Sequence, residues 1–361
     1  MSRSRPTLAD VARLAGVSSG TVSLVLNKRS GNVPISAETR ARVMDAVRQL
    51  GYVPNPVAQM LAGGASRLIG VFAYEARFPY EREDFFFPYL LGIEREASKQ
   101  DYDLLLFTRS RGCQPRTIYC DGVNQLRRAD GAIVMGSQTN RDELRMLAEE
   151  GYPFVSIGRR EVSGQQIAWV ASDYAGGSAE ATRHLIELGH RRLAFLGMGP
   201  PAETSIEKLQ GCREALGRVA GAELAVWDRD LLARPDAFLQ AVRGSAITAL
   251  VCSEIATFVN AVRQLLAAGI KIQEDLSVIS LTDGEADLPI SMKPTVVCLN
   301  RHLMGETAVR LLVDHMRARD AVQQIRFPCQ LVVGNTTRDL SGFSNLTGLG
   351  QWEGGEPQDS A

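Results

Sequence analysis

The side chains that most often catalyse reactions or bind metals are few in this chain and are not grouped in the sequence. None of the four histidines pairs with a nucleophile motif such as G-x-S-x-G. The six cysteines form no C-x-x-C pair, and none stands beside a histidine at metal-ligand spacing. The run GMGPPAET from Gly197 has too few glycines to cradle a phosphate. We therefore expect no enzyme activity, no metal, no cofactor and six reduced thiols.

Basic residues, by contrast, concentrate at the start of the chain. Residues 1–63 contain eight Lys or Arg against three acidic residues, a net charge of +5. Because the 361-residue chain carries −1 in total, the remainder carries −6. A basic head on an acidic body indicates that the head alone meets a polyanion.

Three short helices are predicted in this head. Thr7 begins the first with Asp10 three residues on, a capping-box pattern, and Gly16 ends it. Ser18 caps a second helix to about Leu26, and Ser36 caps a third that ends at Gly51. The first two helices fit a helix-turn-helix, whose second helix presents its N-terminal residues to base edges in the major groove. An ordinary helical hairpin is the alternative.

From Arg67 onward the sequence pattern changes from helical to alternating strands and helices. Short apolar strands alternate with helices over about 270 residues, which predicts two lobes of doubly wound parallel sheet with a ligand cleft between them. The expected strands are 68–73, 103–108, 131–135, 154–157, 192–196, 249–252 and 276–281. The expected helices are 90–100, 142–150, 176–188, 206–220, 256–268 and 301–317.

The resulting division has four parts. Residues 1–53 form the all-α helix-turn-helix head, and 54–66 form a hinge helix and linker around Pro54-Asn55-Pro56. Residues 67–340 form the two-lobed α/β sensor, and the Gly-, Ser- and acid-rich residues 341–361 form a disordered tail. With no apolar run of membrane-spanning length and no leader in MSRSRPTLAD, we expect a cytoplasmic protein with no membrane partner.

The segments TLADVARLAGVSSGTVSLVLN and VPISAETRARVMDAVRQLGYVPNPVAQMLAGG closely resemble the start of lactose-repressor/galactose-repressor (LacI/GalR) family regulators. Weaker similarities continue through RLIGVFA, ATRHLIELGHRRLAFLG and IQEDLSVISL, so the resemblance spans about Pro6 to Asp339. It implies a transcription regulator, by default a repressor, with a periplasmic-binding-protein-like sensor. It also implies that a bound small molecule controls operator affinity allosterically.

The resemblance assigns DNA contacts to matching positions. The positions that match phosphate contacts, which set register without reading sequence, are Thr7, Ser18, Thr21 and Ser23. The positions that match base contacts are Ser19, Gly20 and Leu24, and Leu24 departs from the polar residue common there. Asn27 and Ala58 are further DNA-contacting positions by resemblance. Leu61 matches the hinge-helix wedge that kinks the minor groove, with a plain core residue as the alternative.

Effector contacts are also assigned by resemblance. They are Phe85, Phe86, Asp173, Lys208, Glu254 and Asp283. Each has an ordinary structural alternative: Asp173 could cap a helix, Lys208 could be a solvated helix charge, and the two phenylalanines could be core. Lys208 stands where arginine is usual and Glu254 where asparagine is usual, so we expect neither a standard purine nor a common hexose. A sugar or sugar-derived metabolite is the preferred class, although Lys208 with Arg159 and Arg160 could favour an acidic ligand.

Helix-turn-helix heads read half-sites in pairs, so a homodimer on a palindromic double-stranded operator is expected. A transport-type binding protein would lack the basic head and carry a leader, and a DNA-bending protein would need no sensor. The sequence does not say whether the effector releases DNA or tightens its binding.

Overall fold

The computed structural model describes residues 6–26, 35–53, 65–74, 85–108, 116–136, 139–198, 203–284, 287–289, 291–318 and 322–341. The chain divides into two compact units, Met1–Leu68 and Ile69–Ala361. Each is described separately below.

The N-terminal unit contains α1 (Leu8–Ala15), α2 (Ser19–Leu26) and α3 (Ala37–Leu50). Their apolar stripes meet in a small core made of Val11, Ala12, Ala15, Val22, Val25, Val43 and Ala46. Leu8, Leu26, Val47 and Leu50 of the same helices pack against this core. Apolar residues that recur at helical spacing lie on one face of a helix, and here that face is the buried one.

The helix ends follow the predicted capping residues. The Thr7 side chain accepts a hydrogen bond from the Asp10 backbone and the Asp10 side chain bonds back to Thr7, a complete capping box. Gly16 ends α1 at φ 64°, a left-handed conformation that glycine adopts without steric cost. Ser36 caps α3 through the Thr39 N–H. These local signals fix the turn between α1 and α2.

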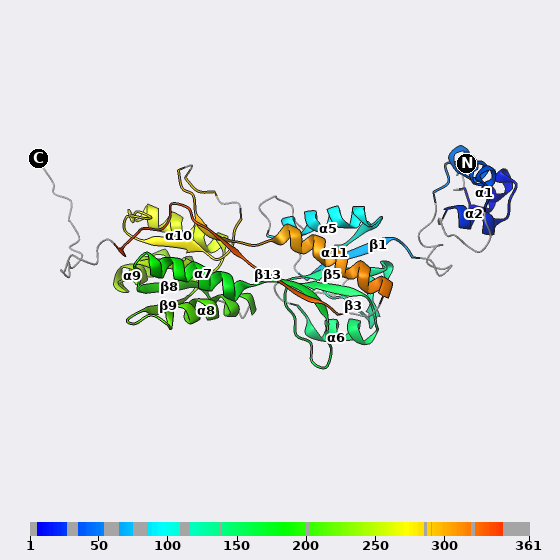
Figure 1. The fold of residues 1–361 in the computed structure, drawn as a ribbon. Coiled ribbons are helices and arrows are strands. Elements are labelled where there is room, and N and C mark those ends of the chain that lie inside the picture. The colour runs from blue at the N-terminus through cyan, green and yellow to red at the C-terminus, as the bar shows by residue number, and fades with distance from the viewer. Residues whose placement is uncertain are drawn as a thin grey trace, which may run out of the picture. The chain divides into compact units, whose positions relative to one another are not determined.

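The first lobe of the larger unit is built on a six-stranded sheet (Figure 1). Its order is β13 (Gln324–Phe327), β7 (Ala168–Ser172), β6 (Phe154–Ile157), β5 (Gly131–Met135), β1 (Leu68–Ala73) and β2 (Asp103–Phe107). The helices of this lobe are α5 (Phe87–Lys99), α6 (Arg141–Glu149) and α11 (Arg301–Ala318). A separate two-stranded hairpin pairs β3 (Tyr119–Cys120) with β4 (Val123–Asn124), and the 3-10 helix η1 (Gln125–Arg128) follows it. Helices α5 and α11 touch closely, since a Cβ on Gly92 would lie 2.0 Å from the His302 carbonyl oxygen.

The second lobe repeats the plan. Its sheet order is β14 (Gln330–Val332), β12 (Thr295–Cys298), β11 (Ser277–Ser280), β10 (Ala249–Cys252), β8 (Arg192–Met198) and β9 (Glu223–Asp228). The helical elements are α7 (Tyr174–Glu187), α8 (Glu203–Leu216), η2 (Arg229–Ala233), α9 (Pro235–Gly244) and α10 (Ile255–Ala267). Strand β14 pairs antiparallel with β12, whereas the other registered pairs are parallel. Central strands buried along their length fit a sheet covered on both faces.

The chain passes between the two sheets three times. It crosses at Asp173, between β7 and α7, and at Leu299–Asn300, between β12 and α11. It crosses again at Pro328–Cys329, between β13 and β14. The crossings are bonded to one another, because Asp173 N–H donates to the Phe327 carbonyl at 2.8 Å and Asn300 Nδ2 donates to the Pro328 carbonyl at 3.0 Å.

Most predicted elements are present, with two kinds of difference. The prediction omitted β7, β9, α9 and the short strands after residue 290, whose apolar runs are brief or broken by polar residues. The expectation of six reduced thiols was wrong, because Cys120 is disulfide-bonded; the spacing of cysteines along the chain could not show this. Cys212, Cys252, Cys298 and Cys329 are free. The hinge segment 54–64 and the tail 342–361 lie outside the described residues.

Across the described ranges, no single helix is long and apolar enough to cross a membrane. Helices α1 and α2 together have the length and composition of a span, but the pair is bent by 102°.

Candidate functional site

The first candidate site is the exposed N-terminal end of α2. Helices α1 and α2 meet at 102°, within the range of DNA-binding helix-turn-helix motifs. Val22 and Val25 hold one side of α2 in the core, while Ser18, Ser19 and Gly20 are exposed. The helix is thus anchored on one face and offers its first turn to a partner, as a recognition helix does.

Hydroxyl groups lie at the starts of both α1 and α2. Ser18 Oγ accepts the Thr21 backbone N–H at 3.1 Å and lies 2.9 Å from Thr21 Oγ1. Thr7 Oγ1 donates to Asp10 Oδ2 at 2.7 Å, and these bonds lower the pKa of the Asp10 carboxyl. Ser23 and Leu24 are half-buried on the same helix. Three predicted DNA contacts, Asn27, Ala58 and Leu61, lie outside the described residues.

The second candidate site is the interlobe cluster, which we define as Phe85, Phe86, Asp173, Lys208, Glu254 and Asp283. Phe85 and Phe86, just before α5, stack edge to face with centroids 5.5 Å apart. Phe86 packs against the core of the first lobe, whereas the Phe85 ring is partly exposed beneath the Arg301 guanidinium, 5.0 Å from its centroid. Asp283 Oδ2 accepts from Arg301 Nη2 at 2.8 Å. The structure thus links Phe85 and Asp283 through a residue that sequence reasoning missed.

Asp173 lies at an interlobe crossing and also caps a helix. Its Oδ1 accepts the Gly176 N–H at 3.2 Å, which begins α7, and lies 3.7 Å from Arg326 Nη1 of β13. Asp173 therefore caps a helix, which was the structural alternative to an effector contact.

Lys208 is buried rather than solvated. Its side chain comes from α8, its Nζ donates to the Ser253 carbonyl at 2.8 Å, and it lies 5.0 Å from the centroid of the Tyr174 ring. Burial lowers the pKa of the Lys208 ammonium to about 8, although the neighbouring Glu254 carboxylate raises it. Glu254 begins α10 without a side-chain capping bond. An ammonium with one protein acceptor has two N–H donors left to offer a ligand.

The thiol of Cys329 lies at the third crossing, between β13 and β14. Burial is the main reason that its pKa is raised to about 12; the charges of Asp173 and Asp283 also raise it, and the charge of Lys208 lowers it.

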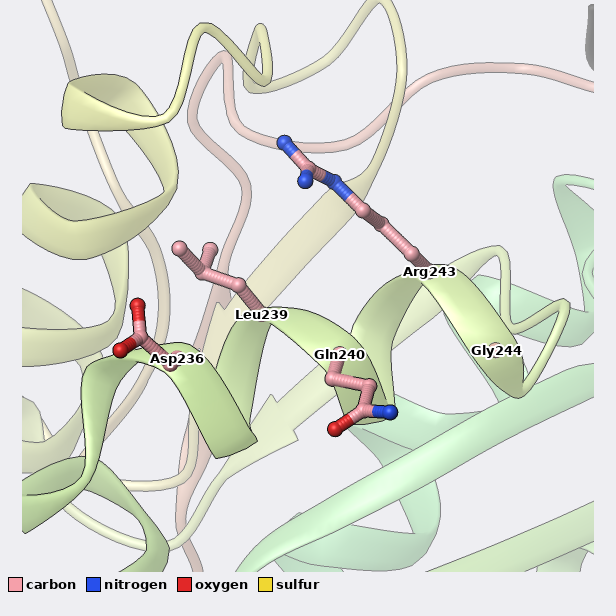
Figure 2. A pocket seen from close by; sticks show the side chains of 5 residues that line it. All are labelled: Asp236, Leu239, Gln240, Arg243 and Gly244. Atoms are coloured by element: carbon pink, nitrogen blue, oxygen red, sulfur yellow. The ribbon is translucent and has the colours of Figure 1, made fainter. Parts of the chain in front are cut away.

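The surface also has a shallow hollow elsewhere. It lies on α9 and is lined by Asp236, Leu239, Gln240, Arg243 and Gly244 (Figure 2). These residues come from three successive turns of one helix and include no member of the interlobe cluster. We assign it no function.

Comparisons with known protein families decide the identity. The family model described as "Bacterial regulatory proteins, lacI family" matches residues 7–55, and that of a periplasmic binding protein-like domain matches residues 182–337. The regulator CelR of Thermobifida fusca is 32% identical over 87% of this chain and 93% of its own length. The chain belongs to the LacI family. It is a DNA-binding transcription regulator controlled by a small-molecule effector.

Other members of the LacI family agree in sequence and fold. The HTH-type transcriptional repressor PurR of Aliivibrio fischeri (strain MJ11) is 28% identical over 88% of this chain and 94% of its own length. The lac repressor dimer bound to operator and the anti-inducer ONPF superposes with a TM-score of 0.74, at 25% identity, over 93% of this chain and 100% of that one. The CelR–cellobiose complex superposes with a TM-score of 0.60, at 28% identity, over 92% of this chain and 100% of that one.

Sequence reasoning missed three members of the interlobe neighbourhood: Arg301, Tyr174 and Arg326. Arg301 and Tyr174 are buried at the first positions of α11 and α7, and Arg326 lies on a strand too short to predict. The one available signal was that Arg301 and Tyr174 begin helices that follow strands, at the carboxyl edge where ligands bind in α/β folds.

Proposed function

We propose that this LacI-family member is a repressor that binds a palindromic operator as a homodimer. The observation that carries the proposal is a recognition-type α2 joined to a two-lobed sensor, an arrangement matched over nearly the whole chain by the operator-bound lac repressor dimer. Paired heads read paired half-sites, so the operator is two-fold symmetric. The protein acts by binding rather than by catalysis, in the cytoplasm.

The proposed DNA interface comprises Thr7, Ser18, Ser19, Gly20, Thr21, Ser23, Leu24 and Asn27, together with Ala58 and Leu61 of a hinge helix. We keep residues 1–53 as the head, 54–66 as the hinge and linker, 67–340 as the sensor and 341–361 as the tail. The exposure of Ser18, Ser19 and Gly20 supports this interface. Leu24 and Gly20 offer no hydrogen bond, so base recognition there rests on apolar contact and close approach.

The proposed effector site is the interlobe cluster, and the proposed effector is a neutral sugar or sugar derivative. Acceptors from Asp173, Glu254 and Asp283, donors from Lys208 and an exposed Phe85 ring suit a ligand with several hydroxyls and an apolar face. The CelR relative was solved with cellobiose.

An acidic ligand is less well supported. Arg159, the first cation proposed to receive it, pairs with Glu161 and with Glu207 at 3.3 Å. Arg160 lies 3.3 Å from Glu203. Both guanidinium groups are already paired with carboxylates of this chain. An acidic ligand would therefore have to displace those carboxylates to bind.

The test is a panel of neutral mono- and disaccharides, cellobiose included, set against uronic acids. A binding sugar raises the melting temperature of the purified protein and changes its operator affinity in an anisotropy titration. Lys208→Met removes both responses but keeps sugar-free operator binding. Lys271→Met is the matched control, because Lys271 is an exposed lysine that pairs with Glu274 on the surface, and it retains both responses. A panel in which uronic acids alone shift the melting temperature would contradict the neutral-sugar proposal.

A further inference from the structure

The first residue of α11 is a buried arginine at an interlobe crossing. Arg301 follows Leu299–Asn300, where the chain leaves the sheet of the second lobe, and its side chain is 7% exposed. Helix α11 packs into the core of the first lobe through Met304, Ala308 and Leu312. The backbone of Arg301 therefore moves with the first lobe.

The Arg301 guanidinium makes contacts to both lobes. Its Nη2 donates to Asp283 Oδ2 at 2.8 Å and to the Asp283 carbonyl at 3.3 Å, in the loop after β11 of the second lobe. Its Nη1 donates to the Phe85 carbonyl at 3.3 Å, just before α5 of the first lobe. The second oxygen of Asp283 accepts the Leu299 N–H of the crossing at 3.0 Å. We name Arg301, Asp283 and Phe85 the Arg301 clamp.

The chemistry of the clamp requires arginine. The planar guanidinium donates in two directions at once, whereas a lysine ammonium of similar reach could bond the carboxylate but not the Phe85 carbonyl as well. Arg301 Nε has no hydrogen-bond partner in the described part of the chain. The ion pair with Asp283 and the hydrogen bonds to the Asp283 and Phe85 carbonyls therefore have to offset the desolvation of the guanidinium. Loss of Asp283 leaves the Arg301 guanidinium buried without its charged partner, and loss of Arg301 leaves the half-buried Asp283 carboxylate without a cation.

We propose that Arg301 is a positioning residue that sets the placement of the two lobes and couples Asp283 to the first lobe. This rests on the proposed function in one respect, since Asp283 and Phe85 belong to the proposed effector site. An effector hydroxyl that donates to Asp283 competes with Arg301 for the carboxylate. Occupancy of the site thereby loosens the link that Arg301 makes between Asp283 and the first lobe.

The test is hydrogen–deuterium exchange of the full-length protein without effector. Two amides report on the clamp: Leu299, bonded to Asp283, and Leu90, bonded to the Phe86 carbonyl at 3.1 Å in the first turn of α5. In Arg301→Met both amides exchange about tenfold faster, because local opening at both ends becomes easier. Arg301→Lys retains the protection of Leu299 but not of Leu90. The double variant Arg301→Met/Asp283→Asn exchanges no faster than Arg301→Met alone.

Arg310→Met is the matched control. Arg310 lies on the same helix and pairs with Glu96 and Glu306 within the first lobe, at 3.4 and 3.7 Å. The Arg310→Met variant leaves the exchange rate of the Leu299 amide unchanged. Unaltered exchange at Leu299 and Leu90 in Arg301→Met, or an equal rise in Arg310→Met, would overturn the proposal. The experiment uses no sugar, so its outcome is independent of whether the cluster binds one.

Discussion

At the scale of single residues, Lys208 shows what a sequence hides. The sequence marked Lys208 as a cation in a pocket position, with a solvated helix charge as the alternative. The structure buries it against Tyr174 and the Ser253 carbonyl. A lysine is seldom fully buried without a partner, and no local pattern shows when one is, because its neighbours come from α7 and from the residue that follows β10. Asp173 was the converse case, since helix capping is a local property and was foreseen.

The pKa of Lys208 makes effector binding pH-dependent. Burial lowers that pKa to about 8, and an effector that accepts from the ammonium binds only the protonated form. Affinity for the sugar identified by the panel should fall by up to about tenfold per pH unit above pH 8. Calorimetric titration from pH 7 to 9.5 measures this. In Lys208→Arg, whose side chain stays charged, the profile is flat; a flat profile in the unaltered protein would show that the ammonium does not contact the effector.

At the scale of elements, local signals predicted the edges of helices and long strands, and non-local contacts decided the remainder. Strands β1, β5, β6 and β10 begin and end where their apolar runs do. Thr7 and Gly16 fixed α1 in the same way. The crossings at Leu299–Asn300 and Pro328–Cys329 could not be predicted, because they depend on which sheet β12, β13 and β14 join, and each of these strands is only three or four residues long.

Two helix caps separate stability from DNA contact. Ser18→Ala and Ser36→Ala each remove a side-chain acceptor at the start of a helix and should lower the free energy of unfolding of the head by about 1 kcal/mol. Only Ser18 lies in the proposed interface. Its variant should also weaken operator binding by about five- to tenfold, equally for all operator sequences, since phosphate contacts carry no sequence information. Urea unfolding and anisotropy titrations check the two effects, and equal operator affinities for the two variants would remove Ser18 from the interface.

At the scale of the whole molecule, a buried histidine links the C-terminal segment to the second lobe. His190 Nδ1 lies 2.8 Å from Thr248 Oγ1, and its Nε2 lies 3.0 Å from Ser277 Oγ and 3.2 Å from the Arg338 carbonyl. Burial lowers the pKa of His190 to about 4. The folded protein therefore keeps this ring neutral in a range where the unfolded chain binds a proton.

This linkage predicts acid sensitivity. Below pH 6.5 His190 binds a proton in the unfolded chain, whereas in the folded chain it stays neutral down to about pH 4. The free energy of unfolding therefore falls as the pH falls through this range. The loss is on the order of 3 kcal/mol by pH 4. His190→Gln removes this contribution, and the slope of its unfolding free energy against pH should be correspondingly shallower. Identical slopes for the two proteins, measured by urea unfolding at several pH values, would contradict the assignment.

Selection on genomic DNA tests whether the protein binds a symmetric operator as a dimer. The purified protein is incubated with fragments of the genome that encodes it, and the retained DNA is sequenced. We expect a short palindrome to be recovered repeatedly, and the genes beside it then indicate which sugars to add to the panel. Retention of no common sequence, or of a motif without two-fold symmetry, would show that the protein does not bind DNA as a symmetric dimer.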